Sequence, residues 1–380
     1  MPTRKLSEEL WKKIGQALLS GTPRRQITHD LGVSEGTVSK VRATLTLPEE
    51  VSAERHRQES QEVVAKYKAA LVEIDKLNKE LSLFTTVSDW SRNFQPVTIE
   101  PKHGGRGEAT AMVGIGDWHY EEQVTAAEVN GVNEFNLDVA RQRTTKLFQS
   151  AASLIDMCRS RSKIDTVVVM LLGDMINNWI HDEYVATNNL TPPQAVLRVF
   201  EDLISGLDFL AKETKAKEII VPCVCGNHGR ITKKIMSKMR VETNLDWLIY
   251  QLVARWFQAR GNKRIRFLLP QGDMTYLKVY QYVVRLAHGD NIRYSGGIGG
   301  VHIPLRKAID NWNTSTRADL NYFGHYHTDL TGEDYRMVGS LIGFNEYSIK
   351  IKARFQRPSQ AFEIIHPRYG ATARFPIILE

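Results

Sequence analysis

The sequence predicts an α/β protein whose main domain is layered, a β-sandwich flanked by helices, and is preceded by a small all-helical module and a long helix. Three observations lead to this prediction. From Ala109 onward, apolar strand-length segments alternate with helix-length segments, whereas the first 48 residues carry only helical patterns. A Pro- and Gly-containing stretch over residues 85–108 separates these two regions. Alternating strands and helices are typical of a layered domain with a partly parallel sheet.

The bulk composition is that of an ordinary globular protein. The chain has 380 residues, enough for two domains, with 42% hydrophobic and 24% charged residues. The formal net charge of +7 is compatible with a nucleic-acid partner but is not diagnostic of one. Three cysteines argue against a disulfide framework and suit a reducing cytoplasm. The charged N-terminus and the strand-length apolar runs predict neither a signal peptide nor a membrane span.

Residues 1–48 predict three short helices. Ser7 and Ser34 can cap the first and third helices, while Gly21 and Gly32 end the first and second. Two short helices joined by a tight Gly-containing turn are the helix-turn-helix signature. We therefore expect a compact DNA-binding domain at this end of the chain.

The basic residues of this module predict a surface that reads DNA. Its first 46 residues hold eight Lys/Arg and four Asp/Glu, so more than half of the chain's excess charge lies on about an eighth of its length. In a helix-turn-helix, the early residues of the second helix face base edges and flanking cations contact phosphates. The predicted DNA-binding residues are Arg24, Arg25, Glu35, Thr37, Ser39, Lys40 and Arg42. The alternative is a trihelical module that mediates protein contacts.

Residues 54–84 read as one long polar helix. Val64, Leu71 and Ile74 belong to an apolar rhythm with spacings of three and four, and Asn78 falls at a position that fixes register in two-stranded coiled coils. This pattern predicts a short coiled coil and a homodimer. A helix that packs its apolar stripe on the catalytic domain is equally compatible with the pattern. Residues 85–108 follow as a predicted linker.

Residues 109–380 predict the catalytic domain. The expected helices are 137–160, 194–214 and 240–260, and the expected strands are 110–116, 166–173, 218–225, 264–269, 274–287, 319–324 and 335–343, with β-rich stretches from residue 360.

Five short motifs supply an Asp, Asn or His where a predicted strand ends. They are Gly116-Asp117-Trp118-His119, Gly173-Asp174-Met175-Ile176-Asn177, Gly226-Asn227-His228, His288-Gly289-Asp290 and Gly324-His325-Tyr326-His327. Ligands bind beyond the carboxyl ends of strands in open α/β sheets, so these side chains can converge. A mixed set of His, Asp and Asn ligands without Cys suits a bound Mn, Fe or Zn ion of a catalytic kind. It does not resemble a structural zinc site, which is usually rich in Cys.

The five motifs in this order, over roughly residues 110–345, resemble the calcineurin-like metallophosphoesterase superfamily. The resemblance implies two divalent metal ions, with Mn expected and Fe or Zn as alternatives. One is held by Asp117, His119, Asp174 and His327, and the other by Asp174, Asn227, His288 and His325. It also implies that His228 protonates the leaving oxygen. Two such metals activate a water and clamp the phosphate in an in-line displacement.

This chain departs from the family at one position beside the site. Family members usually have an acidic residue after Gly-Asn-His, where this sequence has Gly229 followed by Arg230. Arg230 is a candidate phosphate contact instead.

The motifs do not separate phosphatases, small-molecule phosphodiesterases and nucleases, but a DNA-binding module favours a DNA nuclease. The catalytic part resembles the double-strand-break-repair nuclease branch, and the combination with a helix-turn-helix resembles phage-encoded members. We expect a site-preferring endonuclease or nickase in the cytoplasm of a bacterium or a phage-infected host. The alternative is a phosphatase or small-molecule phosphodiesterase with a protein-docking module. A DNA-binding regulator with a vestigial site is disfavoured by the intact ligand set. The sequence contains no Gly-x-x-x-x-Gly-Lys-Ser/Thr loop, so no nucleotide cofactor is expected.

Overall fold

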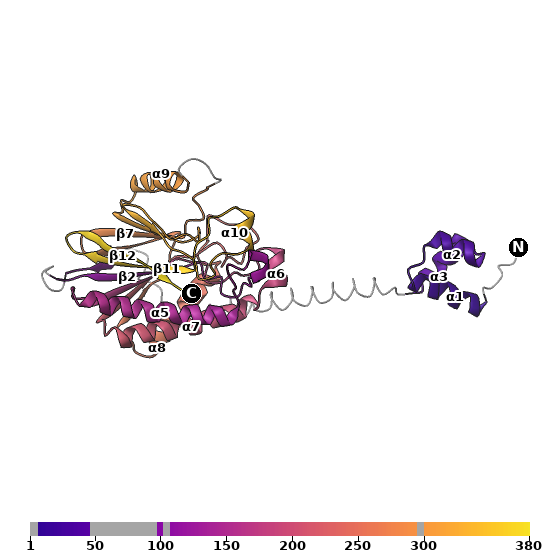
Figure 1. Ribbon diagram of the computed structural model, residues 1–380, viewed down its shortest axis with the longest axis horizontal. Coiled ribbons are helices and arrows are strands. Elements are labelled where there is room, and N and C mark those ends of the chain that lie inside the picture. The colour runs from indigo at the N-terminus through magenta and orange to yellow at the C-terminus, as the bar shows by residue number, and fades with distance from the viewer. Residues whose placement is uncertain (1–6, 46–96, 102–106, 295–299) are drawn as a thin grey trace. The chain divides into compact units, whose positions relative to one another are not determined.

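The structure, a computed structural model, describes residues 7–45, 97–101, 107–294 and 300–380 (Figure 1). The chain divides into two compact units, Met1–Asn93 and Phe94–Glu380. The predicted long helix at 54–84, and with it the coiled-coil dimer, lies outside the described residues. None of the described helices combines the length and the apolarity that a membrane crossing requires.

The first unit contains the three helices that the sequence predicts. They are α1 (Glu8–Leu19), α2 (Arg24–Leu31) and α3 (Glu35–Arg42). The hydroxyls of Ser7 and Ser34 accept hydrogen bonds from the backbone N–H groups of Leu10 and Thr37, as expected of helix caps. The helices enclose a small core of Ile14, Leu18, Ile27, Val38 and Val41.

The second unit is built on two six-stranded sheets. The first sheet has the order β12-β11-β2-β3-β4-β5, with strands β2 (Thr110–Ile115), β3 (Thr166–Leu171), β4 (Glu218–Pro222), β5 (Ile265–Leu268), β11 (Ser359–His366) and β12 (Gly370–Ile378). The second has the order β1-β6-β7-β8-β10-β9, with strands β1 (Val97–Ile99), β6 (Met274–Val279), β7 (Tyr282–Ala287), β8 (Leu320–Phe323), β9 (Leu330–Thr331) and β10 (Tyr335–Met337). Strands β2 to β5 are parallel, as the alternation of strands and helices predicts.

Helices cover the outer face of each sheet, which gives four layers (Figure 1). Alternate residues of the fully buried strand β3 face opposite ways: Val167 and Val169 pack among the helices α5 (Leu137–Arg159), α7 (Pro192–Glu213) and α8 (Leu245–Ala259). Val168 packs against the second sheet. The helix α9 (His302–Asn313) covers the far face of that second sheet. The layered α/β architecture predicted from the sequence is therefore confirmed.

The structure differs from the sequence prediction in several elements. Strand β1 lies inside the predicted linker 85–108 and pairs with β6. It was not predicted because three residues are too few to show an alternating pattern. The predicted strand 274–287 is a hairpin of β6 and β7 that turns at Tyr280, a residue with positive φ that carries no Gly or Asn signal. The helix expected at 240–260 begins at Leu245, where Asn244 caps it. The helices α6 (Asp182–Thr187), α9 and α10 (Glu346–Lys350) and the 3-10 turn η1 (Ala126–Val129) were not predicted.

Candidate metal centre

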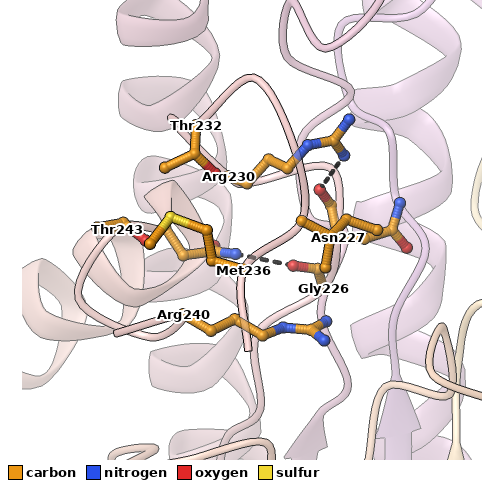
Figure 2. A pocket seen from close by; sticks show the side chains of 9 residues that line it. Gly226, Asn227, Arg230, Thr232, Met236, Arg240 and Thr243 are labelled. Carbon is orange, nitrogen blue, oxygen red and sulfur yellow. Dashed lines mark hydrogen bonds between the residues drawn. The ribbon is translucent and has the colours of Figure 1, made fainter. Parts of the chain in front are cut away.

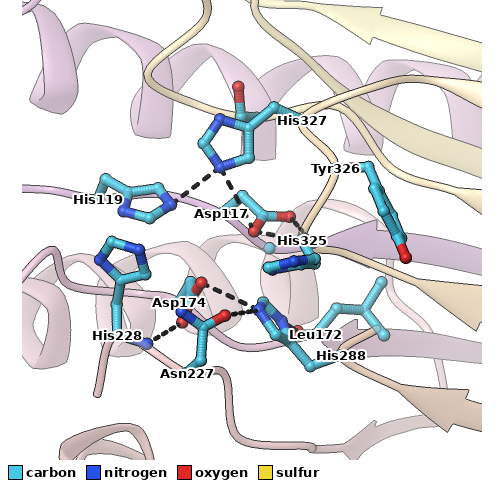
Figure 3. A network of polar contacts seen from close by, with 12 residues as sticks. Asp117, His119, Leu172, Asp174, Asn227, His228, His288, His325, Tyr326 and His327 are labelled. Carbon is cyan, nitrogen blue, oxygen red and sulfur yellow. Dashed lines mark hydrogen bonds and ion pairs between the residues drawn. The ribbon is translucent and has the colours of Figure 1, made fainter. Parts of the chain in front are cut away.

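The five motif loops meet where their strands end. Asp117 follows β2, Asp174 follows β3 and Asn227 follows β4, while His288 and His325 follow β7 and β8 of the second sheet. Figure 3 shows their side chains gathered in one place, with His119, His228 and His327 beside them. The sheet topology therefore brings together residues that are up to 210 positions apart in the sequence.

Five of the seven predicted ligands have left-handed backbone conformations. Asp117, His119, Asp174, His325 and His327 have φ between 45° and 71°. Such values are uncommon outside glycine and cost about 1–3 kcal/mol where the surroundings impose them. Only eleven non-glycine residues of the described part of the chain have positive φ, so nearly half of them are these ligands. The loops are bent in the way needed to turn these side chains inward.

Two glycines allow the loops after β3 and β4 to touch. A Cβ atom on Gly226 would lie 2.0 Å from Oδ1 of Asp174, and one on Gly173 would lie 2.3 Å from the backbone N of Gly226. Gly173 also has a φ of +90°, which side-chain-bearing residues rarely adopt. The Gly-Asp and Gly-Asn pairs of the motifs are thus explained by the close approach of two backbones.

Within the described residues, three groups of side chains have ligand atoms that lie within 4.8 Å of one another. They are Asp117, His119 and His327; Asp174, His288 and His325; and His119, Asp174 and His228. Oδ1 of Asn227 lies 3.2 Å from Nε2 of His288, which adds it to the second group. All seven predicted ligands therefore come together. The first group holds three of the four residues predicted for one metal ion, without Asp174, and the second, with Asn227, holds the four predicted for the other. The third group places His228 beside His119 and Asp174.

His119 and His327 face each other through ring nitrogens in the way that two ligands of one cation do. Nδ1 of His119 lies 3.1 Å from Oδ1 of Asn177, which can only accept, so Nδ1 carries the proton. Nε2 of His119 then points a lone pair at Nε2 of His327, 3.0 Å away. Burial, together with the charge of His228, lowers the pKa of His119 to about 3, and burial beside His119 lowers the pKa of His327 well below its ordinary value. Two neutral imidazoles facing each other in this way are arranged as metal ligands are.

In the second group, both ring nitrogens of His288 lie beside oxygen atoms. Nδ1 of His288 lies 2.7 Å from the carbonyl oxygen of Leu172, and its Nε2 lies 2.9 Å from Oδ2 of Asp174. Burial opposes the charged form of His288, but Asp174 and Asp117 together raise its pKa to about 10. Nε2 of His288 thus faces oxygens of Asp174 and Asn227, and these three residues would together hold a divalent cation. Metal-bound histidines commonly donate their other N–H to a carbonyl, as His288 does.

Burial would raise the pKa of the Asp174 carboxyl, but the charges of His288 and His228 hold it well below its usual range. The buried carboxylate therefore stays ionised, with a ligand atom within 4.8 Å of those of His288 and His325 and, in the third group, of His119. Oxygen and imidazole donors of this kind, with no Cys among them, fit two divalent metal ions.

Two buried carboxylates that the sequence analysis missed hold the ligand loops in place. Asp246, in the first turn of α8, accepts hydrogen bonds from the backbone N–H groups of Asp174 (2.9 Å), Met175 (3.1 Å) and Gly226 (2.9 Å). Glu121 accepts from those of Asn177 (3.0 Å) and Asn178 (2.6 Å). Asp246 could have been noted as an acidic residue in a helix's first turn. Its backbone partners, 20 to 72 residues away, have no sequence signature.

We expect Asp246→Ala to destabilise the protein and to weaken metal binding. The substitution leaves three buried N–H groups without an acceptor, which should cost at least about 3 kcal/mol of unfolding free energy. Loss of a group that orients metal ligands typically lowers affinity by about 10–100-fold. Urea unfolding and Mn²⁺ titration measure the two effects. Asp208→Ala, which removes a half-buried carboxylate on α7, is the control, and an Asp246→Ala protein with wild-type Mn²⁺ affinity would contradict this role.

Arg230, the candidate phosphate contact, lies directly against a ligand loop. Its guanidinium donates to the carbonyl oxygen of Asn227 at 2.7 Å, and its Nε has no hydrogen-bond partner among the described residues. Figure 2 shows Arg230 and Arg240 on a small pocket of about 10 Å³, roughly the space of one water molecule. Arg240 is held by Asp290 at 2.6 Å. Arg240 thus has a carboxylate partner, whereas the contact made by Arg230 is with a neutral carbonyl oxygen.

The predicted DNA-binding residues lie on α2 and α3 of the first unit. Glu35, Ser39 and Lys40 are exposed on α3, and Arg24 and Arg25 are exposed at the start of α2. Thr37 and Arg42 are half-buried, and the Thr37 hydroxyl lies 3.0 Å from that of Ser34, so it shares in the helix cap.

No family model matches the chain, and no curated protein matches it. Among solved structures it is similar to a single mutant of Vps29 from Entamoeba histolytica, with 14% identity over 70% of this chain and 98% of the other and a TM-score of 0.29. A predicted phosphoesterase from Streptococcus pneumoniae shows 10% identity over 70% and 98%, with a TM-score of 0.28. A dimetal phosphatase from Danio rerio shows 11% identity over 75% and 100%, with a TM-score of 0.34. Similarities this low carry no argument about function, which rests on the geometry of the metal centre.

Proposed function

We propose that this protein is a metal-dependent hydrolase of the calcineurin-like metallophosphoesterase kind and that it cuts phosphodiester bonds in DNA. The observation that carries the proposal is the convergence of seven Asp, Asn and His side chains, from loops after five strands, into two adjoining groups of donors. Structural Asp and His clusters have no need of strained ligand backbones, whereas sites that must hold an exact coordination geometry commonly have them.

Each donor has a proposed role at this centre. Asp117, His119 and His327 hold one divalent cation, and Asn227, His288 and His325 hold the other, with Asp174 between them. Mn is the proposed metal, with Fe or Zn as alternatives. When bound, such cations supply charge neutralisation for the phosphate and a water that is nucleophilic near pH 7.

His228 is proposed to protonate the leaving oxygen. Its backbone N–H donates to Oδ1 of Asp174 at 2.7 Å, and its Nδ1 lies 3.0 Å from the carbonyl oxygen of Asn177. Nδ1 therefore carries a proton, and Nε2 is the nitrogen proposed to act as the acid. Burial lowers the pKa of His228 to about 4. The negative charge of an arriving phosphate opposes this shift and favours the protonated form.

The first unit supports DNA as the substrate. Its exposed Arg24, Arg25 and Lys40 and its two short helices joined by a turn suit a helix-turn-helix reader. A fixed-site reader is useful to an endonuclease, whereas an exonuclease must leave each position after cutting. A single centre hydrolyses one phosphodiester at a time, so one engaged site produces a nick. A dimer would place two readers on a two-fold DNA site.

A substrate panel tests this function. Purified protein with Mn²⁺ is incubated with supercoiled plasmid, linear duplex, single-stranded DNA and a bis-nitrophenyl phosphodiester. We expect conversion of supercoiled plasmid to nicked circles, and loss of all activity with a chelator. Hydrolysis of the small ester with no cleavage of any DNA would instead favour the phosphatase or small-molecule phosphodiesterase.

Deletion of residues 1–48 should separate site choice from chemistry. We expect the shortened protein to hydrolyse the small phosphodiester at an unchanged rate, because every proposed metal ligand lies in the second unit. Its cuts in plasmid DNA should lose their preferred positions. Sequencing of the cut ends provides the measurement. Random cuts by the full-length protein, or identical cut sites after the deletion, would contradict a DNA-reading role.

A further inference from the structure

Two short segments of the second unit are rich in positive charge and have no negative charge. Residues 230–240 contain five Lys or Arg, residues 347–357 contain four, and neither contains Asp or Glu. These nine charges exceed the chain's whole net excess of seven. The basic character of the protein therefore depends on these two stretches as much as on its N-terminal module.

The same two segments expose large apolar side chains. Of the sixteen exposed large hydrophobic residues in the described part of the second unit, eight lie here: Ile231, Ile235, Met236, Met239, Tyr347, Ile349, Ile351 and Phe355. Met239 is 65% exposed and Tyr347 is 56% exposed. Apolar residues gathered in this way mark a contact surface more often than residues scattered singly do.

Both segments are tied to the loops that carry the metal-centre residues. The first begins at Arg230, which donates to the carbonyl of Asn227 and whose own carbonyl accepts from the Asn178 side chain at 2.8 Å. In the second, Oε1 of Gln356 accepts from the backbone N–H of Asp329 at 2.8 Å, two residues beyond His327. His327 belongs to the first group of donors and Asn227 adjoins the second. The two segments thus adjoin the loops of two different donor groups.

Six of the nine cations are available to a ligand. Arg240 and Arg357 are engaged by Asp290 and Glu380, and Arg230 by the Asn227 carbonyl. The remaining six have no ion-pair partner within the residues that the structure describes: Lys233, Lys234, Lys238, Lys350, Lys352 and Arg354. All six are exposed.

We propose that residues 230–240 and 347–357 grip a nucleic-acid strand that runs across the metal centre, so that the substrate is a polymer rather than a phosphorylated side chain or a small ester. The inference rests on the proposed phosphodiesterase function and names how the catalytic unit itself holds its substrate. Phosphates repeated along a strand can meet the cations of both segments, which a single phosphate cannot do. Ile and Met side chains can enter between base steps, and Tyr347 and Phe355 can stack on bases.

A membrane surface with acidic lipids also attracts mixed basic and apolar segments. Both segments adjoin loops of the proposed centre, however, and a nucleic-acid strand held by them brings the phosphodiester bonds of the proposed substrate to those loops. Nucleic acid is therefore the better match for this placement.

Two triple variants of the full-length chain test the proposal, K233Q/K234Q/K238Q and K350Q/K352Q/R354Q. The control, K146Q/K263Q/K307Q, removes three exposed lysines elsewhere on the second unit. Binding to a short labelled duplex and to the corresponding single strand is measured by fluorescence anisotropy in EDTA, over a series of salt concentrations. We expect each test variant to bind at least one of these about tenfold more weakly than the control, with a salt slope smaller by about 2–3.

Hydrolysis of the bis-nitrophenyl phosphodiester should be equal in all three variants, because that ester does not reach the segments. Test variants that bind both nucleic acids as tightly as the control would overturn the proposal. So would loss of binding to phosphatidylserine vesicles without loss of binding to nucleic acid. The binding measurement uses no metal, so a protein that grips DNA through these segments yet hydrolyses nothing would refute the proposed function alone.

Discussion

Asp174→Ala should abolish hydrolysis of both DNA and the small phosphodiester and should reduce bound Mn²⁺ from two ions per chain. Asp174 is buried and is grouped both with His288 and His325 and with His119, so its loss should disturb both groups of donors. Since loss of a merely supporting residue costs about 10–100-fold, loss of the residue shared by both sites should exceed about 100-fold. Elemental analysis of dialysed protein and initial rates with both substrates provide the measurement.

Asp174→Asn is the companion variant. Its amide oxygen can still accept the hydrogen bond from the backbone N–H of His228, so the fold should be retained while the bridging negative charge is lost. Asp208→Ala, which removes a half-buried carboxylate on α7 that is none of the proposed donors, controls for the removal of a carboxylate. Near wild-type rates with two metal ions in Asp174→Ala would remove the basis for the assigned centre.

His228→Ala should retain both metal ions and cut DNA about 10²–10⁴-fold more slowly, the usual cost of losing a general acid. The bis-nitrophenyl ester should be affected much less, because nitrophenolate departs without needing a proton. The comparison of the two substrates separates proton donation from metal binding. His181→Ala, which removes an exposed histidine from a nearby loop, is the control.

The third group of donors makes this experiment decisive. His228 lies with His119 and Asp174 in a cluster that could itself hold a cation. Loss of one metal ion in His228→Ala, with equal rate losses on both substrates, would make His228 a ligand and end its proposed role as the acid.

The convergence of the candidate ligands could be predicted from the sequence because their signals are local. Each of the five motifs joins an apolar strand to a Gly, Asp, Asn or His within a few residues, and the strand order then brings the motifs together. The caps at Ser7 and Ser34 are local in the same sense. Short-range chemistry of this kind is visible in one sequence without an alignment.

The supporting residues could not be predicted, because they act on backbone groups that every residue possesses. Nothing in the sequence links Asp246 to the N–H of Asp174, or Glu121 to that of Asn177. The turn at Tyr280 and the strand β1 were missed for a related reason. Tyr280 has a positive φ although it is not a glycine, and β1 has only three residues. Both features depend on pairing with neighbouring strands, which a local sequence pattern does not show.

The most direct test of the two-metal account is an anomalous-difference map from a crystal of the full-length protein grown with Mn²⁺. The account predicts two peaks for each chain. One lies among Asp117, His119, Asp174 and His327, and the other among Asp174, Asn227, His288 and His325. A single peak, or none at these side chains in a crystal saturated with Mn²⁺, would contradict it.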